Sequence, residues 1–403
     1  MDDFRRKAAI YEKPQRYYNG DHDLRFATEK FENTFGSLFR EFALNLCPVV
    51  CDAVRDKLRI TGFDGHGKLT PEGVELAGSI WNRNRMRLRS GEVHKEVLKC
   101  GDAYVIVWPD AAGRAVIHPN RASQIAVEYD DESPGRITSA AKYWFTRDKF
   151  VRLNLFYPDR IEKYISKEKC EGTLPEAKEF VEFGERPSPI ANPFGVVPVF
   201  HFANNADLGS MGRSELEAAI PLQDGLNKSV LDMLVAMEFS AFRQRWAAGI
   251  EVDYDANGKA IQPYTAGVEK LWVAGDANAR FGDFDAAELE QFLKVKDSFR
   301  VDVASVTGTP LHYFLQQAGE FASGESLRRS ETRFLAKVRD RQEAFGQVWA
   351  DIMALALRIE GANGIDLATE WEDPSPMTER ERLENLLLKA RIDGHSRTRK
   401  ATA

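Results

Sequence analysis

A glycine-rich stretch near residue 320 is the first candidate for chemistry. It reads Gly319-Glu320-Phe321-Ala322-Ser323-Gly324-Glu325-Ser326, and its glycines have the spacing of a P-loop, which binds nucleotide phosphates. A P-loop needs a lysine before its final hydroxyl residue, but Glu325 occupies that position. Because a carboxylate would repel phosphates, we interpret the glycine spacing as coincidence.

Histidines and carboxylates, the other groups that could do acid–base or metal chemistry, form no known motif. The seven histidines are scattered, and the chain has no HExxH, no GxSxG turn and no GxGxxG after a strand. His312 has the least ordinary setting, beside Tyr313 and Phe314, and even there packing on a neighbour is favoured. Acidic pairs such as Asp253 with Asp255 stand in turn-like segments, where Asp makes local hydrogen bonds. The sequence therefore predicts no catalytic residue, no cofactor and no metal site.

The four cysteines indicate buried thiols rather than a disulfide framework or a zinc site. At helical spacing Cys47 and Cys51 would share one apolar face with Val50 and Val54. A zinc site would need a second cysteine pair or nearby histidines, and none is close in the sequence. Cys100 and Cys170 stand alone.

Composition limits the class of protein. The 403 residues suggest two or three structural units, and a hydrophobic fraction of 43% is enough for packed cores. No apolar run approaches the roughly 18 residues that span a bilayer, and the first residues lead into no apolar signal region, so we expect synthesis in the cytoplasm. With 55 Lys+Arg against 62 Asp+Glu, the net charge of -7 argues against tight binding of nucleic acid by bulk positive charge.

The first half of the chain is predicted to be helical and then β. Apolar residues recur three or four apart over residues 23–58, and Thr70-Pro71 has the pattern of a helix N-cap followed by proline. A further helix over 85–99 is closed by Gly101, and a hairpin over 103–118 begins a series of short strands to about Tyr164. Residues 1 to about 205 therefore form a helical-then-β unit.

The second half is predicted to alternate long helices with short excursions. Ser214 and Glu217 have capping-box spacing and open a helix to about Trp246, whose apolar residues between 230 and 242 occupy almost every face. Short strand-like segments follow over 250–284, a second helix begins at Ala286, and a loop rich in helix breakers covers 307–326. Helical spacing then continues over 327–359.

The order of these elements and five short motifs resemble the portal proteins, or head-to-tail connectors, of long-tailed phages. The motifs are Tyr17-Tyr18-Asn19-Gly20-Asp21-His22 with Leu24-Arg25-Phe26-Ala27, Asn192-Pro193-Phe194-Gly195-Val196-Val197-Pro198-Val199, Gly212-Arg213-Ser214-Glu215-Leu216, Ile220-Pro221-Leu222-Gln223-Asp224 and Gly308-Thr309-Pro310-Leu311-His312-Tyr313-Phe314. The resemblance extends from about residue 17 to about residue 359.

This resemblance implies an α+β chain with the portal-type architecture. The implied regions are a helical/β wing (1–213), a wing-to-stem helix (214–249), a small α/β clip (250–285), a second stem helix (286–306), a tunnel loop (307–326), a long wing helix (327–366) and a short helical crown or C-terminal tail (367–403).

The resemblance also implies which residues carry function and which partners they meet. Implied are DNA-facing tunnel-loop residues (His312, Tyr313, Gln316, Gln317 and Phe321), stem and subunit-interface residues (Phe239, Phe242, Trp246, Phe292 and Phe299) and clip residues that dock the terminase or adaptor (Tyr254, Tyr264 and Trp272). Implied partners are further copies in a ring, usually of twelve subunits, double-stranded DNA that passes without sequence preference, the large terminase, a head-tail adaptor, and the major capsid and scaffolding proteins, but no membrane. The implied location is the portal vertex of the virion.

Charge and length help to weigh the alternatives. A protein that surrounds sliding DNA must not hold phosphates tightly, and an acidic ring satisfies that requirement. The first alternative is a metal-dependent nucleic-acid enzyme whose site is assembled from Asp253, Asp255, Asp283 and Asp285. A smaller head-tail adaptor is the second, although adaptors are usually much shorter than 403 residues. The loop over 307–326 could also serve only to seal neighbouring subunits.

Overall fold

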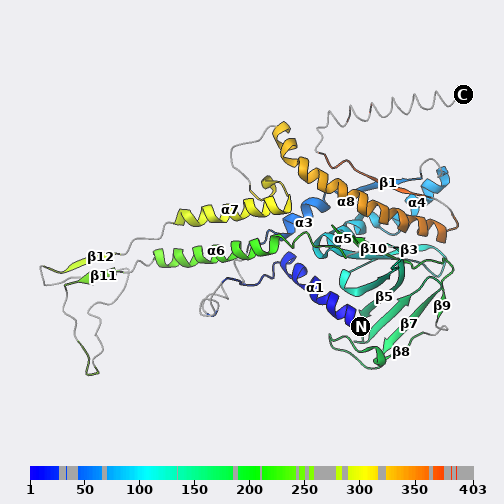
Figure 1. The fold of residues 1–403 in the computed structure, drawn as a ribbon, viewed down its shortest axis with the longest axis horizontal. Coiled ribbons are helices and arrows are strands. Elements are labelled where there is room, and N and C mark those ends of the chain that lie inside the picture. The colour runs from blue at the N-terminus through cyan, green and yellow to red at the C-terminus, as the bar shows by residue number, and fades with distance from the viewer. Residues whose placement is uncertain are drawn as a thin grey trace. The chain divides into compact units, whose positions relative to one another are not determined.

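The computed structural model divides the chain into two units, whose helices and strands are labelled in Figure 1. It describes residues 1–26, 33, 44–65, 70–133, 135–184, 189–208, 211–241, 245–249, 254–257, 278–283, 289–315, 324–362, 366–375, 383 and 387. The first unit contains Met1–Asn19, Leu46–Ile220 and Ala304–Ala403, and the second contains Gly20–Asn45 and Pro221–Val303.

The described residues form both helices and strands, which confirms the predicted α+β class. The helices of the described residues are α1 (Asp2–Tyr18), α3 (Cys47–Arg55), α4 (Pro71–Arg83), α5 (Met86–Cys100), α6 (Ala219–Ala241), α7 (Leu289–Thr307) and α8 (Gly324–Ile359), with 3-10 turns at Ala122–Gln124, Ala177–Glu179 and Leu311–Tyr313. The strands are β1 (Ile60–Asp64), β2 (Asp102–Pro109), β3 (Ala115–Asn120), β4 (Ile125–Tyr129), β5 (Ile137–Phe145), β6 (Val151–Phe156), β7 (Arg160–Ser166), β8 (Phe180–Glu182), β9 (Ile190–Ala191), β10 (Val199–Ala203), β11 (Arg245–Ala248), β12 (Arg280–Asp283) and β13 (Ala368–Trp371).

A three-stranded antiparallel sheet with the order β10-β2-β3 is the centre of the first unit. One face of this sheet packs on α8, where the ring of Phe202 lies 4.9 Å from that of Trp349. The other face places Tyr104 and Ile106 in a core shared with Ile125 of a six-stranded antiparallel sheet. That second sheet runs β4-β5-β6-β7-β8, with β9 also paired to β7. The alternation of side chains along β2 therefore lets one strand contribute to two cores.

Several local predictions are confirmed by the described residues. The Thr70 side chain accepts a hydrogen bond from Gly73 N at the start of α4, and Gly101 follows α5 with a φ of 94°. Since a positive φ is inexpensive only for glycine, Gly101 ends α5 and turns the chain into β2. Cys47 and Cys51 are both buried free thiols on α3.

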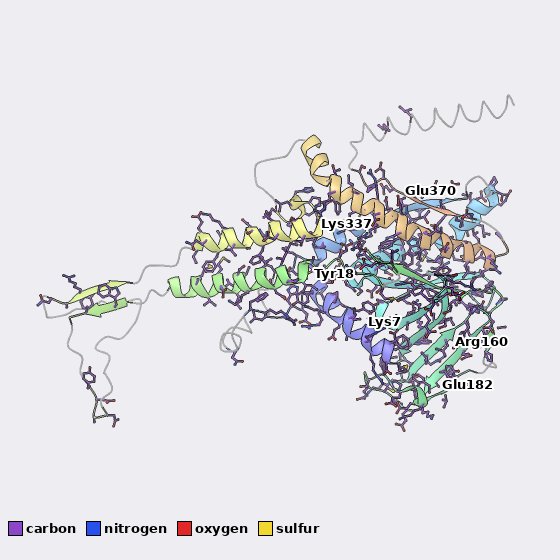
Figure 2. The ribbon with its side chains drawn as sticks, viewed as in Figure 1. Lys7, Tyr18, Arg160, Glu182, Lys337 and Glu370 are labelled. Carbon is purple, nitrogen blue, oxygen red and sulfur yellow. The ribbon has the colours of Figure 1, made fainter. Side chains whose placement is uncertain are left out.

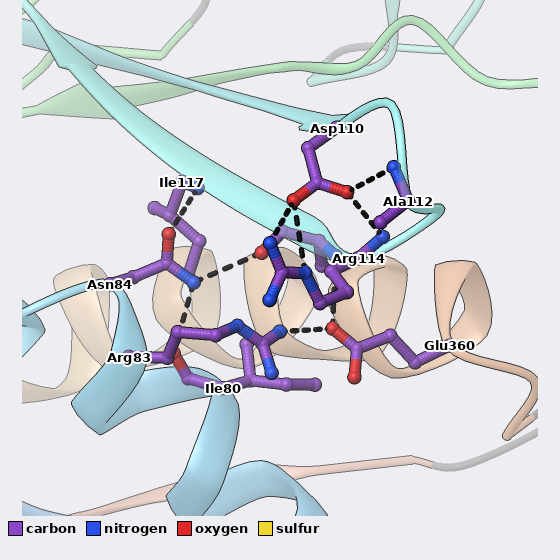
Figure 3. Close-up of polar contacts among 9 residues, drawn as sticks. Ile80, Arg83, Asn84, Asp110, Ala112, Arg114, Ile117 and Glu360 are labelled. Atoms are coloured by element: carbon purple, nitrogen blue, oxygen red, sulfur yellow. Dashed lines mark hydrogen bonds and ion pairs between the residues drawn. The ribbon is translucent and has the colours of Figure 1, made fainter.

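Two polar side chains, buried Asn84 and half-buried Glu360, join α4, β3 and α8 (Figure 3). The Asn84 amide donates to the carbonyls of Ile80 and Ala115, and its oxygen accepts from Ile117 N at 3.0 Å. Glu360, just after α8, accepts from Ala115 N at 2.9 Å and forms an ion pair with Arg83. These contacts satisfy backbone groups at the edge of the sheet that burial would otherwise leave costly.

The C-terminal region contributes a strand to the first unit. β13 pairs antiparallel with β1, and the hydroxyl of Thr369 donates to the carbonyl of Gly346 on α8 at 2.7 Å. The ring nitrogen of Trp371 lies beside Gly346, where a Cβ would be only 3.0 Å from it. The assignment of residues 367–403 to a crown or C-terminal tail stays a prediction, and residues 368–371 within that range are extended and paired with β1. Two further described residues of this range, Leu383 and Leu387, are helical.

Three other boundaries differ from the sequence prediction. The pattern analysis missed α1, whose helix has only a moderate apolar stripe. The helix predicted to begin at Ser214 begins at Ala219, and it ends at Ala241 rather than near Trp246. The helix predicted from residue 327 begins at Gly324, so residues 324–326 belong to α8 and not to a loop. None of the helices in the described ranges has the length and hydropathy needed to cross a membrane.

Candidate functional site

In the second unit, α6 and α7 make a close contact around a glycine. A Cβ added to Gly225 on α6 would lie 2.8 Å from the ring of Phe299 on α7, so only glycine fits under that ring without a shift. The helices leave large apolar side chains exposed, namely Met237 on α6 and Leu293, Val295 and Val301 on α7. Exposed aliphatic side chains on paired helices are typical of surfaces that another protein chain covers.

The predicted stem residues fall into different settings. Phe292 and Phe299 are half-buried on α7. Phe239 is on α6, and Phe242 lies outside the described residues. Trp246 is not helical as predicted: it belongs to β11, which pairs with β12, and its ring covers Gly282, where a Cβ would be 2.6 Å away. The helix ends before Trp246 because the chain turns into this two-stranded ladder.

Of the predicted clip residues, Tyr254 is described and is 68% exposed, while Tyr264 and Trp272 lie outside the described residues. Asp255 accepts a hydrogen bond from Asn257 N, which is the turn interaction that its sequence position predicts. Asp283 is in β12, and Asp253 and Asp285 lie outside the described residues. Among the described residues no group of three or more His, Cys, Asp or Glu side chains could hold a metal ion.

Helix α7 passes into the predicted tunnel loop through a tight anchored segment. Gly308 has a φ of 66° and ends the helix at Thr307. The next residues form the 3-10 turn Leu311–Tyr313, in which His312 Nε2 lies 3.4 Å from Glu331 Oε1 on α8. The ring of Tyr313 lies 5.8 Å from that of Phe334 on the same helix. Two of the predicted DNA-facing residues, His312 and Tyr313, therefore contact α8; Gln316, Gln317 and Phe321 lie outside the described residues.

The segment that leads into α6 carries Glu215, whose carboxylate forms buried ion pairs within the first unit. Glu215 accepts from Lys337 at 2.5 Å and from Arg341 at 3.1 Å, both on α8, and its other contact is the Asn204 amide at 3.1 Å. Burial acts to raise the pKa of the Glu215 carboxyl, but the Lys337 ammonium and the Arg341 guanidinium outweigh it and lower that pKa below its usual value. Glu215 is therefore ionised at neutral pH. Figure 2 labels Lys337 on α8.

The same segment crosses the end of α5 at a glycine pair. Gly212 and Gly101 lie so close that a Cβ on Gly212 would be 2.0 Å from the Gly101 carbonyl oxygen. The Ser214 hydroxyl donates to the carbonyl of Lys99 at 2.5 Å and accepts from Leu216 N at 3.0 Å. This hydroxyl accepts from Leu216 N and not from Glu217 N, and α6 begins only at Ala219, so the capping-box interpretation of Ser214 and Glu217 is wrong.

A buried carboxylate beneath this crossing joins several elements. Asp102 accepts from the Tyr11 hydroxyl at 2.6 Å, from His201 Nε2 at 2.7 Å and from Gly212 N at 2.8 Å. The Tyr129 hydroxyl hydrogen-bonds to the other ring nitrogen of His201. Thus α1, β2, β4 and β10 are all tied to the chain that enters α6. Both ring nitrogens of His201 are therefore hydrogen-bonded, and the residue has a structural role.

A hollow of about 680 Å³ in the first unit opens beside Glu215. It is bounded by the segment before α6, the last turn of α7 and the N-terminal half of α8. Its charged lining residues are Arg213, Glu215, Glu217, Arg333, Lys337, Asp340 and Arg341. Because cations and anions are nearly balanced and several pair with one another, this lining has no strong preference for a ligand of one sign.

Sequence reasoning identified the motif around Glu215 but not its role. The motif Gly212-Arg213-Ser214-Glu215-Leu216 carried the family resemblance, yet no local pattern indicated partners more than a hundred residues away on α8. The one available signal was an acidic residue between a glycine and a buried leucine, Leu216, where burial of the carboxylate requires a cationic partner.

Residues 60–396 match the sequence model of a known family, described as phage portal protein, SPP1 Gp6-like. The chain belongs to this family of phage portal proteins. The resemblance inferred from the motifs is thereby confirmed. The match covers β1 through α8, including the Glu215 cluster and the anchored segment after α7.

Two portal proteins are also similar to this portal-family chain. It is 29% identical over 201 residues to the portal protein of Mycobacterium phage L5 and 29% identical over 196 residues to that of Mycobacterium phage D29. These alignments cover 47% and 46% of this chain, but 41% and 40% of the two relatives. The match thus spans less than half the length of the curated relatives.

Solved structures from gene transfer agent (GTA) particles were matched as well. One is the neck of an empty GTA particle computed with C6 symmetry, with 13% identity, a TM-score of 0.48, and coverage of 91% of this chain and 90% of the other. Another is the virion of a native GTA particle, with 12% identity, a TM-score of 0.45, and coverage of 86% and 84%. The family assignment rests on the sequence match.

Proposed function

We propose that this chain forms a ring at one vertex of a phage capsid and that double-stranded DNA passes through the ring during packaging and ejection. The observation that carries the proposal is the match to the portal family over residues 60–396. The ring would act as a conduit and a docking platform rather than as an enzyme, with energy supplied by a separate terminase.

In this proposal the limits of the wing, stem, clip, tunnel loop and crown are set by the observed helices and strands. The first unit supplies the wing, with α8 as its long helix; α6 and α7 supply the stem, and the strands β11 and β12 begin the clip. The tunnel loop lies between Thr307 and Gly324, and the tail after Trp371 supplies the crown. The exposed aliphatic side chains of α7 support a stem that neighbouring copies cover.

The acidic charge supports a sliding rather than a gripping channel. Twelve copies at -7 each would give a ring of roughly -84, and this charge would disfavour tight, static binding of phosphates. Contact with DNA would then come from neutral or weakly charged side chains such as His312 and Tyr313, which touch the backbone without reading bases. The clip, including exposed Tyr254, would meet the terminase and later the adaptor, while the wing would meet the capsid and scaffolding proteins.

The most direct test is electron microscopy of the purified full chain. We expect ring-shaped particles with a central hole when viewed end-on, and their symmetry gives the number of subunits. Monomeric particles under conditions that support assembly would contradict the proposal.

A substitution in the proposed stem tests the ring interface. Phe239 lies on α6 among apolar residues on almost every face, so Phe239→Asp would place a charge where neighbouring copies pack. We expect protomers or open aggregates in native mass spectrometry. Intact rings would argue against a stem interface at this residue. The matched control is Glu238→Asp, which changes the neighbouring residue while keeping its charge.

Deletion of residues 316–321 tests the tunnel loop. We expect rings to assemble while DNA packaging or retention is impaired, measured as protected DNA per particle. If packaging is normal, this loop has no role in handling DNA. If rings fail to assemble, the loop serves to seal neighbouring subunits.

A divalent-metal nuclease assay on the purified chain separates the conduit from the alternative enzyme. We expect no cleavage of linear DNA with Mg²⁺ or Mn²⁺ present. Cleavage that is lost in an Asp255→Asn, Asp283→Asn variant would support the enzyme instead.

A further inference from the structure

The chain passes between its two units at four places, and the described structure places two of them next to one charged cluster. One passage follows Ile220, five residues after Glu215, and another precedes Ala304, three residues before Thr307. Glu215 and Thr307 both belong to the first unit, and both contact the same side chain of α8. That shared side chain makes their positions interdependent.

Lys337 is the shared side chain. Its ammonium donates to Glu215 at 2.5 Å and to the carbonyl oxygen of Thr307, in the last turn of α7, at 2.9 Å. The Lys337 side chain is 15% exposed and that of Glu215 is 7% exposed, so water screens this ion pair far less than a surface pair. A lysine ammonium near the carbonyls that end a helix is also favoured by the helix dipole.

We propose that Glu215 and Lys337 form a clamp that couples the segment entering α6 to the last turn of α7. Loosening either segment then loosens the other, because Glu215 and Thr307 both bind the Lys337 ammonium. In a portal ring, and so resting on the function proposed above, the clamp connects the base of the tunnel loop to the chain entering the first stem helix. The coupling itself is a property of the isolated chain.

The charges around the clamp explain why coupling follows from one side chain. Arg341, whose side chain is 6% exposed, also binds Glu215 and has Asp340 as a second partner. Without the Glu215 charge, Lys337 would remain partly buried beside the like charge of Arg341. Because an uncompensated buried cation is costly, Lys337 would turn toward solvent and leave the Thr307 carbonyl.

Hydrogen exchange of the purified full chain tests the clamp with the variant Glu215→Gln, which keeps the shape and removes the charge. We expect exchange to accelerate about tenfold in residues 304–309 as well as in residues 205–218, since a hydrogen bond to a charged group is lost at each. The response over 304–309 is decisive because the clamp reaches that segment through the Lys337 ammonium. Acceleration confined to 205–218 would overturn the proposal.

A second variant and two controls sharpen the measurement. Lys337→Met should accelerate hydrogen exchange in both 205–218 and 304–309. An exchange rate equal to that of the wild type in either segment would overturn the clamp. Glu217→Gln changes an exposed acid two residues from Glu215, and Arg339→Met changes an exposed cation of α8 that contacts Ser375. Both control variants should exchange like the wild type over 304–309, and acceleration in them would show that any loss of charge has the same effect.

Global instability is recognised by faster exchange in β6 and β7, which lie far from the clamp in the sheet order. In that case Glu215→Asp, which keeps the charge but shortens its reach, replaces Glu215→Gln. Faster hydrogen exchange of the Glu215→Asp variant over both 205–218 and 304–309 supports the clamp. Any other exchange pattern over these two segments overturns it. The measurement needs neither rings nor DNA, so its failure is distinct from failure of the proposed portal function.

Discussion

Gly101 and Gly212 cross with no space for a side chain between them. A Cβ on Gly101 would lie 2.6 Å from the Gly212 carbonyl oxygen, and Gly101 has a φ of 94°. Across this contact, Asn204 N donates to the Gly101 carbonyl at 2.8 Å. Backbone contacts thus hold the end of α5 against the end of β10 and the chain entering α6, and the side chains of Ser214 and Asp102 add hydrogen bonds there.

Gly101→Ala is expected to destabilise the first unit by more than about 3 kcal/mol, because a backbone clash is added to the strain of a positive φ. Gly113→Ala is the matched control, since Gly113 has a φ of 75° but no heavy atom within 4 Å of an added Cβ. We expect Gly113→Ala to lower the free energy of unfolding by about 1 kcal/mol. Urea denaturation measures both, and equal costs would show that the crossing tolerates a side chain.

A double-mutant experiment tests the contact between α6 and α7. Gly225→Ala should cost about 1 to 3 kcal/mol in the wild type, because its Cβ would press on the Phe299 ring. In a Phe299→Ala background the same change should stabilise by up to about 1 kcal/mol, since alanine favours a helix over glycine. The sign of the effect therefore reverses between backgrounds. Denaturant titrations of the four proteins measure it, and an equal cost in both would refute the packing.

His94 is expected to make stability depend on pH. It is fully buried on α5, accepts a hydrogen bond from Trp349 Nε1 at 2.9 Å, and burial lowers its pKa to about 3. Between that pKa and the unfolded value of about 6.5, only the unfolded chain binds the proton, so stability falls as pH falls.

The measurement compares the wild type with His94→Gln, which retains an acceptor but does not titrate. Between pH 7.5 and pH 5, we expect the wild type to lose about 2 kcal/mol more unfolding free energy than the variant. Other groups titrate alike in both proteins and cancel in the difference. Parallel losses in the two proteins would show that His94 is protonated while folded.

Tyr11→Phe tests the network under the glycine crossing. Burial and the nearby Asp102 raise the pKa of Tyr11 well above its usual value, so its hydroxyl stays protonated and donates to the Asp102 carboxylate. Loss of this donor should cost about 1.5 to 3 kcal/mol in thermal or urea unfolding. Tyr164→Phe removes a hydroxyl bonded to Glu162 in a more exposed place and should change stability by less than about 0.5 kcal/mol. Similar costs would mean that Asp102 does not need Tyr11.

Helix ends and turns could be predicted from the sequence where a residue interacts with its neighbours in the chain. Thr70, Gly101 and the hairpin after it were placed correctly because caps and turns depend on a few adjacent residues. The long α8 was also recognised, because its apolar positions repeat over many turns. The family was recognised from motif order.

Long-range partners could not be predicted from local pattern. Ser214 has the spacing of a capping box, but its hydroxyl binds the Lys99 carbonyl, and Glu215 binds cations more than a hundred residues later. Trp246 looked like the continuation of an apolar helix, whereas its strand is defined by pairing with β12. In each case tertiary contacts outweighed a weak local preference.

The pairing of β1 with β13 has a consequence for synthesis on the ribosome. Residues 60–64 have their strand partners about 300 positions later, so this ladder cannot form until residues 368–371 have been translated. Trp349 of α8, which covers Phe202 and His94, is also made late. Nascent chains therefore expose the apolar face around Phe202 and His94 until α8 has been made, and this face is open to association with other chains during that time.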